Sequence, residues 1–560
     1  MNGLTLLLVL GCIAVDCLAA EVQLIDAPPA DGIDWYYWPS QPPAGCPFKP
    51  STELTGLGFT GRHAEYTNAD TWYPTWASDG DLYSPFTDGV VNGLQSVSIG
   101  ENATTGHARI VGDDPLELKV VDEGVWTASA LPYGGRYPCG SLVYNGVWYY
   151  GTYCLADESV PGYNWGVLGP FVGFRTSNDF GKTWTETLHT PAAPLFPEPA
   201  EFRGPVKIGS PHFVDFGRNM QHSPDGKAYL IAHGALIPDP LPHPGNASWI
   251  TGDAIYLLRV TPSLEIINDP AAYEFFAGYD ADGKALWTND FKAMKPLLEF
   301  NNHCGCVTVT YNPGLGKYLM CLTDGGNTVS TYDTCLLEAD SVAGPWRMVT
   351  WMRQFGTQGY FVNLPSKFLS EDGQTAWLCY AANFTGTTPP SPPGSRYGMC
   401  LQEVKLLGPD APRPSGPLFD EANLARTASV TVSSTFENYS VWGAVDGVVG
   451  GFPGATRHEW ATDHETKTGT IRLEWDTPQL VDRIWLFDRP NTNADQVTQG
   501  FLLFDDGTSI AVGPLPDDAT QGIEVSFEPK RVKWLAFAIA DTKTGAYATG
   551  LSEIAVFAAD

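Results

Sequence analysis

Positively charged residues are scarce in this sequence. Its 560 residues include 32 Lys and Arg against 63 Asp and Glu, a net charge of −31, and no basic stripe offsets this imbalance. A field of that sign repels polyanions, which excludes nucleic acid and an anionic membrane surface as partners. Neutral or weakly charged partners remain, and sugars are among them. We expect the chain to act as a monomer.

Long hydrophobic runs are also lacking after the N-terminus. The apolar run at residues 4–15 is too short to span a bilayer and is followed by Ala19 and Ala20, although no Lys or Arg precedes it. This pattern predicts a signal peptide over residues 1–20 and a secreted, extracellular protein. Four N-x-Ser/Thr sequons agree with a secreted glycoprotein: Asn102, Asn246, Asn383 and Asn438.

Neither Cys-x-x-Cys nor His-x-x-x-His zinc spacing occurs in the sequence. Nine cysteines remain after loss of the signal peptide, and in an oxidising compartment they are expected to form disulfides. Three pairs fit neighbouring strands: Cys139 with Cys154, Cys321 with Cys335, and Cys379 with Cys400. Cys46, Cys304 and Cys306 are left over, so at least one thiol is expected to be free.

Turn-forming residues are spread through the chain instead of following a short repeat. Gly (59) and Pro (45) interrupt short segments throughout, while 43% of residues are hydrophobic. This apolar share can fill a large core, and the frequent turns exclude collagen and long helical bundles. The pattern predicts an all-β protein.

A weak internal repeat refines this prediction. In each copy a strand ends in a turn with Gly and an aromatic-rich strand follows, which is typical of a β-hairpin. The turn glycines are Gly80, Gly146, Gly226, Gly316 and Gly373, at intervals of 66, 80, 90 and 57 residues. One propeller blade with its loops occupies about that much chain. We therefore expect a five-bladed β-propeller over residues 21–407, with an irregular β-sandwich as the alternative.

One segment of this region carries a specific motif. Residues 177–184, Ser-Asn-Asp-Phe-Gly-Lys-Thr-Trp, match the sialidase Asp-box, S-x-D-x-G-x-T-W, at every fixed position. The resemblance implies a propeller hairpin in which Asp179 caps the turn and Trp184 packs beneath the blade. In the sialidase-like families the motif lies far from the active site, so Asp179 is not expected to be catalytic.

The C-terminal quarter has a different pattern. Residues 408–419 are rich in Pro and Gly and are interpreted as a linker. Residues 420–560 resemble the discoidin-type (coagulation factor C-terminal) jelly roll of many carbohydrate-binding modules. That resemblance implies a sugar-binding β-sandwich with a structural Ca²⁺ at Asp446 and Glu553. The alternative is that both are ordinary turn and edge residues. No cofactor is expected for catalysis.

Polar residues on the inner strands of a propeller meet near its axis. Asp70 and Asp88 flank the first hairpin, and pairing of their strands would bring both carboxyl groups to one end of the sheet. Later repeats supply further candidates: His212, Asp215, Asn302, His303, Tyr360 and Asn363.

At these residues the chain resembles a known family. Residues 70–89 and 311–384 resemble the five-bladed, sialidase-superfold glycoside hydrolases, near the proteins of unknown function related to bacterial endo-D-arabinanases. The resemblance implies hydrolysis of O-glycosyl bonds by acids around the axis. No Arg-Ile-Pro-like start is present, so sialic acid is not the expected substrate.

Glycoside hydrolysis needs two carboxyl groups, one protonated and one ionised. We expect Asp70 and Asp215 to be the principal pair, with Asp88 tuning a pKa or binding a hydroxyl; an ordinary turn at Asp88 is the alternative. Stacking on sugar is expected from Trp72, Trp76 and Tyr360, although Trp76 equally suits a core position. The remaining substrate contacts are expected from His212, Asn302, His303 and Asn363.

The predicted function is therefore a secreted glycoside hydrolase that acts on a polysaccharide or glycan. The main alternative is a non-catalytic lectin or adhesin, since propellers also serve as binding platforms. A polysaccharide lyase with Tyr360 or His303 as its base is a third option.

Overall fold

The computed structural model describes most of the chain. The described residues are 18–28, 35–159, 166–198, 204–238, 248–326, 330–385, 392–419, 422–436, 439–452, 456–491, 494–518 and 520–559. Residues 1–17 of the expected signal peptide and the sequons at Asn246 and Asn438 lie outside them. Within the described part, no helix has both the length and the apolar character needed to cross a membrane.

The chain divides into two compact units, one formed by residues 34–412 and the other by residues 1–33 with 413–560. Both are built from strands. Over the described residues the helices are single 3₁₀ turns: η1 (Arg218–Met220), η2 (Pro270–Ala272), η3 (Phe291–Ala293), η4 (Ser366–Phe368), η5 (Leu424–Thr427), η6 (Val441–Ala444) and η7 (Thr456–His458). The prediction of an all-β protein is confirmed.

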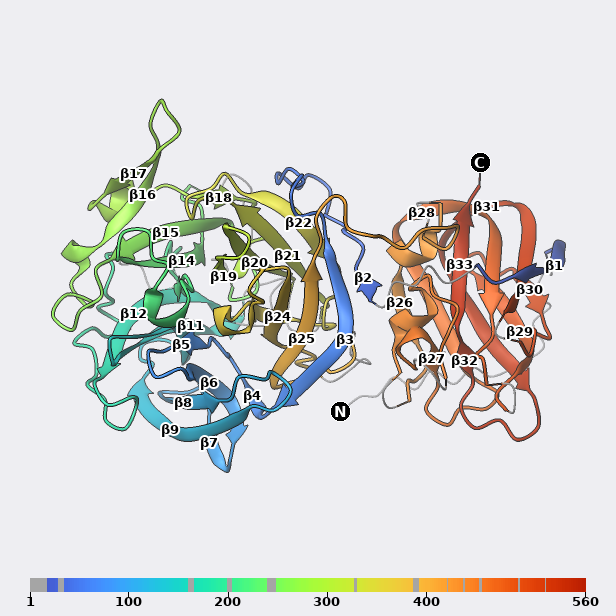
Figure 1. The fold of residues 1–560 in the computed structure, drawn as a ribbon, viewed down its shortest axis with the longest axis horizontal. Helices are drawn as coiled ribbons and strands as arrows, with labels where there is room; N and C mark the ends of the chain where they lie inside the picture. Colours follow the sequence, from blue (N-terminus) through green and yellow to red (C-terminus); the bar gives the residue numbers. More distant parts are fainter. Residues whose placement is uncertain are drawn as a thin grey trace. The chain divides into compact units, whose positions relative to one another are not determined.

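Residues 36–406 form small antiparallel sheets in a propeller-like arrangement around a common centre (Figure 1). The first sheet contains β4 (Asn68–Asp70), β5 (Thr75–Trp76), β6 (Leu82–Val91), β7 (Leu94–Ser96), β8 (Asn102–Val111) and β9 (Lys119–Ser129). The next contains β10 (Gly135–Tyr144), β11 (Val147–Ser159) and β12 (Gly166–Ser177).

Three further sheets follow along the chain. One contains β13 (His212–Phe213), β14 (Ala228–Gly234), β15 (Ala254–Val260), β16 (Glu274–Tyr279), β17 (Ala285–Thr288) and β18 (Leu298–Glu299). Another contains β19 (Gly305–Asn312), β20 (Lys317–Gly325), β21 (Tyr332–Ala339) and β22 (Arg347–Met352). The last contains β23 (Tyr360–Asn363), β24 (Thr375–Ala381), β25 (Met399–Leu406), β3 (Leu57–Tyr66) and β2 (Tyr36–Tyr37).

The last sheet joins the two ends of this unit. β3 pairs antiparallel with β25, so that Leu57 lies opposite Leu406 and Tyr66 opposite Met399. A strand from the start of the unit thus completes a sheet begun near its end. This pairing protects the hydrogen-bonding edge of β25 and closes the arrangement.

The predicted hairpin turns are present. The five turn glycines, Gly80, Gly146, Gly226, Gly316 and Gly373, all have positive φ, between 66° and 100°. At Asn145-Gly146 both turn residues have positive φ, which is the geometry of a two-residue hairpin between β10 and β11. Local sequence therefore determines these turns.

The Asp-box also has the predicted structural role. The Asp179 carboxylate accepts hydrogen bonds from the Ser177 hydroxyl (2.7 Å), the Thr183 amide (2.8 Å) and the Thr183 hydroxyl (2.6 Å). Trp184 packs against Trp148, with ring centroids 5.2 Å apart. Asp179 thus holds the turn.

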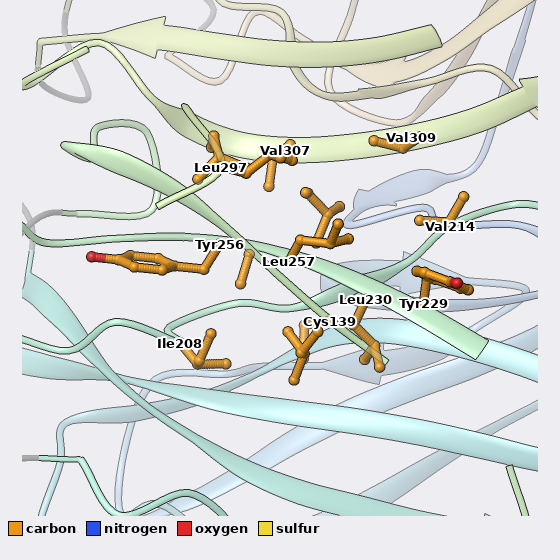
Figure 2. Packing of buried hydrophobic residues seen from close by; sticks show 14 of the residues in the cluster. Cys139, Ile208, Val214, Tyr229, Leu230, Tyr256, Leu257, Leu297, Val307 and Val309 are labelled. Atoms are coloured by element: carbon orange, nitrogen blue, oxygen red, sulfur yellow. The ribbon is translucent and has the colours of Figure 1, made fainter. Parts of the chain in front are cut away.

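A large apolar core fills the space between the sheets. Figure 2 shows one part of it, where Leu230 of β14, Leu257 of β15 and Val307 of β19 face one another. Where β13 and β23 approach each other, the ring centroids of Tyr73 and His212 lie 3.8 Å apart and those of Tyr73 and Phe361 lie 5.2 Å apart. Aromatic side chains therefore pack between these two strands.

The unit formed by residues 1–33 and 413–560 has sheets of its own. A seven-stranded sheet contains β1 (Ala20–Asp26), β26 (Ser429–Val432), β28 (Thr470–Phe487), β29 (Val497–Phe504), β30 (Ser509–Val512), β31 (Gln521–Thr542) and β33 (Glu553–Ala558). β27 (Trp460–Ala461) pairs with β32 (Gly550–Leu551).

The position of β1 corrects an expected boundary. The sequence predicts residues 21–26 as the start of the first domain and Ala20 as the end of the signal peptide, yet these residues pair with β31, with Ala20 opposite Phe527 and Asp26 opposite Gln521. β1 is almost entirely exposed and lies at the sheet edge, so its sequence carries little of the burial pattern that would reveal its partner.

The three expected disulfides are absent, and all nine cysteines from Cys46 onward are free thiols. The strand register explains two of these errors. Cys321 lies opposite Leu336 and Cys379 opposite Leu401, so that Cys335 and Cys400 are each displaced by one residue. Because side chains alternate between faces, such a displacement places the two thiols on opposite faces of the sheet. In the third pair, Cys154 lies opposite Arg136 instead of Cys139.

Candidate functional site

A cavity of about 410 Å³ lies where several sheets of the propeller-like unit meet. That volume is within the range of small-molecule sites. Its lining residues are Asp70, Thr71, Asp88, Gly89, Gln95, Ser96, Val97, Ile99, Tyr137, Tyr153, Leu155, Trp249, Phe361, Phe384 and Tyr397. The described lining thus combines two carboxyl groups with six aromatic rings and contains no basic side chain. We call it the Asp70 cavity.

Asp70 is buried, with 6% of its surface exposed, at the end of β4. Its carboxyl oxygens accept hydrogen bonds from the hydroxyls of Thr71 (2.8 Å) and Tyr360 (2.9 Å). Burial, with a further contribution from the nearby Asp88 charge, raises the pKa of Asp70 to about 8 despite these hydrogen bonds. Asp70 therefore carries a proton at neutral pH.

Asp88 lies on β6, the neighbour of β4, as the sequence predicted. Its carboxylate accepts a 2.6 Å hydrogen bond from the Ser98 amide, and the Tyr397 hydroxyl donates to its backbone carbonyl. Burial raises the pKa of Asp88 to about 6, less than that of Asp70. The two acids are coupled through their charges and differ in acidity, as a general acid and its partner must.

The backbone around these acids is strained. Thr71, Asp88 and Phe361 line the cavity and have φ of 67°, 46° and 54°. Left-handed backbone is unfavourable for a β-branched or bulky residue and gathers at functional sites. Gly89 is also required, because a Cβ there would lie 2.0 Å from the Asn68 carbonyl oxygen.

The structure does not bring Asp215 to this cavity. Its carboxylate accepts hydrogen bonds from the Ser366 amide (2.7 Å), the Ser366 hydroxyl (2.7 Å) and the Gly217 amide (2.9 Å). It lines a separate cavity of only about 40 Å³. The expected pairing with Asp70 is therefore wrong: Asp215 ties the segment after β13 to η4, and Asp88 is the acid beside Asp70.

His212 and Asn363 line that same small cavity. The His212 imidazole lies against Tyr73 and 3.2 Å from the Ser210 hydroxyl, and burial lowers its pKa well below the ordinary value. Asn363 donates to the backbone carbonyls of Trp72 (3.0 Å) and Phe361 (2.8 Å). Both side chains therefore make contacts within the protein, which differ from the substrate contacts predicted for them.

The predicted stacking residues also have other positions. Trp72 is 1% exposed, stacks on Phe86 and donates to the Ala69 carbonyl at 2.8 Å, so it belongs to the core. Trp76 donates to the Gly80 carbonyl within its own hairpin. Tyr360 is fully buried and holds the Asp70 carboxyl instead of presenting its ring to a ligand.

His303 and Asn302 are likewise not among the residues that line the Asp70 cavity. The His303 imidazole lies 2.7 Å from an Asp324 carboxylate oxygen and stacks on Phe300 with ring centroids 4.0 Å apart. The backbone N–H of Asn302 donates to an Asp253 carboxylate oxygen at 3.2 Å. Neither Tyr360 nor His303 lines the cavity, so the structure does not place there the two residues expected for the lyase alternative.

Sequence reasoning missed the six rings that line the cavity: Tyr137, Tyr153, Trp249, Phe361, Phe384 and Tyr397. Tyr137 and Tyr153 lie opposite each other on β10 and β11, with ring centroids 5.7 Å apart. Each lies in an aromatic-rich strand or loop where nothing local distinguishes it from a core residue. Only the fold reveals which rings face the acids.

Asp446 and Glu553 lie together in the C-terminal unit. Asp446 pairs with His458 at 2.6 Å, and Glu553 accepts a 3.1 Å hydrogen bond from the Gly447 amide. Burial and the Asp446 charge raise the pKa of Glu553 well above the ordinary value, and its second carboxyl oxygen is buried without a partner. This oxygen fits a hard cation. Among the described residues, no group of three or more His, Cys, Asp or Glu could hold a metal ion, so carbonyl ligands would have to complete the shell.

Several known proteins are similar to parts of this chain. Residues 423–557 match a domain family of unknown function, DUF7402, and the search of curated proteins found no match. A glycoside hydrolase structure covers 88% of this chain and 97% of its own length, at 12% identity and a TM-score of 0.30. The lectin domain of lectinolysin, complexed with Lewis b antigen, covers 25% of this chain and 99% of its own length, at 21% identity and a TM-score of 0.22. The module CpGH89CBM32-5 from Clostridium perfringens, complexed with GalNAc-β-1,3-galactose, covers 23% of this chain and 95% of its own length, at 17% identity and a TM-score of 0.20.

Proposed function

We propose that this chain is a secreted glycoside hydrolase whose active site is the Asp70 cavity. The observation that carries the proposal is a pair of aspartates in one cavity, Asp70 buried and Asp88 half-buried, with unequal pKa values of about 8 and about 6. Aromatic rings around the pair suit the apolar faces of sugars. The described lining has no cation, which favours a neutral glycan over a sialic acid or a uronic acid.

In the proposed reaction, protonated Asp70 donates its proton to the glycosidic oxygen as the bond from that oxygen to the anomeric carbon breaks. Ionised Asp88 acts at the anomeric carbon, either directly or by taking a proton from the attacking water. Thr71 and Tyr360 keep the Asp70 carboxyl in position.

The proposal includes the finer architecture. The sheets of residues 36–406 serve as five blades, closed by the pairing of β3 with β25. The C-terminal unit serves as a sandwich that binds sugar and raises the local concentration of substrate. An exposed aromatic cluster supports that role: Tyr547 is 57% exposed, and its ring centroid lies 4.3 Å from His464.

The test of the catalytic proposal is Asp70→Asn. The purified protein is screened against neutral plant, fungal and bacterial wall polysaccharides by detection of new reducing ends. We expect Asp70→Asn to lose activity by about 10³-fold or more while the melting temperature stays close to that of the parent. Asp215→Asn is the comparison, because it should lower stability more than Asp70→Asn does. Full activity of Asp70→Asn would contradict the proposal.

We also propose that a Ca²⁺ ion binds at Asp446 and Glu553. Calcium should then raise the melting temperature of the C-terminal unit, and a chelator should reverse the effect. Glu553→Gln should abolish the response to calcium. A parent protein whose unfolding is insensitive to calcium and to chelator would contradict the calcium proposal.

A further inference from the structure

A second, larger cavity lies beside the Asp-box. It has a volume of about 900 Å³ and shares no lining residue with the Asp70 cavity. Its lining residues are Asp79, Asp81, Tyr83, His107, Arg109, Glu123, Gly124, Val125, Trp126, Phe180, Gly181, Lys182 and Trp184. They come from strands β6, β8 and β9 of the first sheet and from the turns at residues 77–81 and 178–184. We call this cavity the Trp126 groove.

Two half-buried indoles form its apolar surface. Trp126 lies on β9, whereas Trp184 lies in the loop after β12 at the end of the Asp-box, so they come from different parts of the chain. The Arg175 guanidinium, 2% exposed, packs against both rings, 4.6 Å from the centroid of Trp184 and 5.7 Å from that of Trp126. The same guanidinium lies 3.9 Å from the Tyr150 ring, which is fully buried.

These contacts fix the two rings before any ligand arrives. The Trp126 indole nitrogen also donates to the Glu186 carboxylate at 3.0 Å. The ring centroid of Trp184 lies 5.1 Å from that of His107 and 5.2 Å from that of Trp148. Rings held in this way lose little conformational entropy when a ligand binds. Rings that served only as core would be fully buried, whereas Trp126 and Trp184 remain partly exposed on the groove.

The polar lining has charges of both signs. Asp79, Asp81 and Glu123 supply acceptors, whereas Arg109 and Lys182 supply donors. Arg109 is paired with Asp81 at 2.7 Å, so part of this charge is balanced within the groove. Such a lining suits hydroxyl groups, while the net charge of −31 disfavours polyanionic chains.

We propose that the Trp126 groove is a second carbohydrate-binding site, which takes a neutral oligosaccharide by stacking its rings on Trp126 and Trp184. Its volume is near the upper end for small-molecule sites and holds more than one sugar ring. Sugar hydroxyls bond to Glu123 and Lys182. Because no residue is shared with the Asp70 cavity, this proposal does not depend on the catalytic assignment.

The test measures binding by the full chain carrying Asp70→Asn, so that cleavage does not interfere. Cellohexaose, xylohexaose, mannohexaose and chitohexaose are titrated by calorimetry. We expect at least one of them to bind, and Trp126→Ala to remove one binding event or weaken it at least about tenfold. Trp287→Ala is the matched control, because Trp287 is also half-buried and packs on an arginine, with Arg259 3.9 Å from its ring.

Glu123→Gln provides a second variant that keeps the packing of the groove intact. It should weaken the same binding event about threefold to tenfold, since an amide replaces one carboxylate acceptor. Binding that is unchanged in Trp126→Ala and Glu123→Gln would overturn the proposal, as would failure of all four oligosaccharides to bind. If the parent protein cleaves no polysaccharide, yet an oligosaccharide still binds and Trp126→Ala weakens that binding, only the catalytic proposal is contradicted.

Discussion

At the scale of single residues, Asp70 and Asp88 have the same side chain but different surroundings. Asp70 is buried deeply beside another acid, whereas the Asp88 carboxylate accepts a hydrogen bond from the Ser98 amide. The proposed reaction needs Asp88 ionised and Asp70 protonated. We therefore expect kcat/KM to rise as pH passes about 6, to reach a maximum near 7 and to fall as pH passes about 8. A rate profile with its maximum near pH 4 would contradict these roles.

Tyr360 tests the coupling within this site. Its hydroxyl donates to Asp70 and lowers the pKa of that carboxyl relative to burial alone. Tyr360→Phe removes this donor, so the pKa of Asp70 should rise. The fall of kcat/KM on the alkaline side of the pH profile should therefore move to higher pH by up to about one unit. The rise on the acidic side should move less.

The control for this variant is Tyr332→Phe. Tyr332 is buried nearby, with its ring centroid 6.4 Å from that of Tyr360, and its hydroxyl has no hydrogen-bond partner in the described chain. Tyr332→Phe should leave both the acidic and the alkaline side of the kcat/KM profile at the same pH as in the parent. A uniform loss of rate in Tyr360→Phe without a shift of either side would indicate a purely structural role.

At the scale of elements, the close contact between β4 and β6 positions the two acids. Asp70 lies opposite Thr87, and the register shifts between Asn68 and Asp70 as it does at a bulge. Gly89→Ala would place a Cβ 2.0 Å from the Asn68 carbonyl oxygen, so one strand must move. We expect a loss of about 1–3 kcal/mol in the free energy of unfolding.

The activity of Gly89→Ala should fall more than its stability predicts, because the displaced strand carries Asp70 or Asp88. Chemical denaturation and kcat measured on the same preparations separate the two effects. Gly408→Ala is the control, since the nearest atom to its Cβ is 3.7 Å away, an ordinary contact. Normal activity in Gly89→Ala would mean that this strand pair does not position the acids.

Elements differ in how far the sequence predicts them. Turns such as Asn145-Gly146 and the Asp-box depend on adjacent residues, and the sequence located them correctly. Asp70 and Asp88 were also placed on paired strands. The contribution of Asp215 depends on a contact with Ser366, 151 residues away, which no local pattern reveals. The cysteine pairs failed for a related reason, because a register displaced by one residue reverses the face of a side chain.

At the scale of the whole molecule, the sequence predicted two regions joined by a Pro/Gly-rich segment, and the structure divides the chain within that segment, at residue 413. The boundary at the N-terminus was not predictable, because β1 pairs with β31, about 500 residues away. Long-range pairing of an exposed strand leaves no periodic signal in its own sequence.

Each unit has a separate buried core, and the last prediction follows from this separation. Leu257 is fully buried in the core of the propeller-like unit, and Leu473 is fully buried in that of the C-terminal unit. Replacing either by Ala leaves a cavity that costs about 2–5 kcal/mol. Scanning calorimetry should resolve two unfolding transitions, of which Leu257→Ala lowers one and Leu473→Ala the other. If both variants lowered a single shared transition equally, the two cores would have to unfold as one cooperative unit.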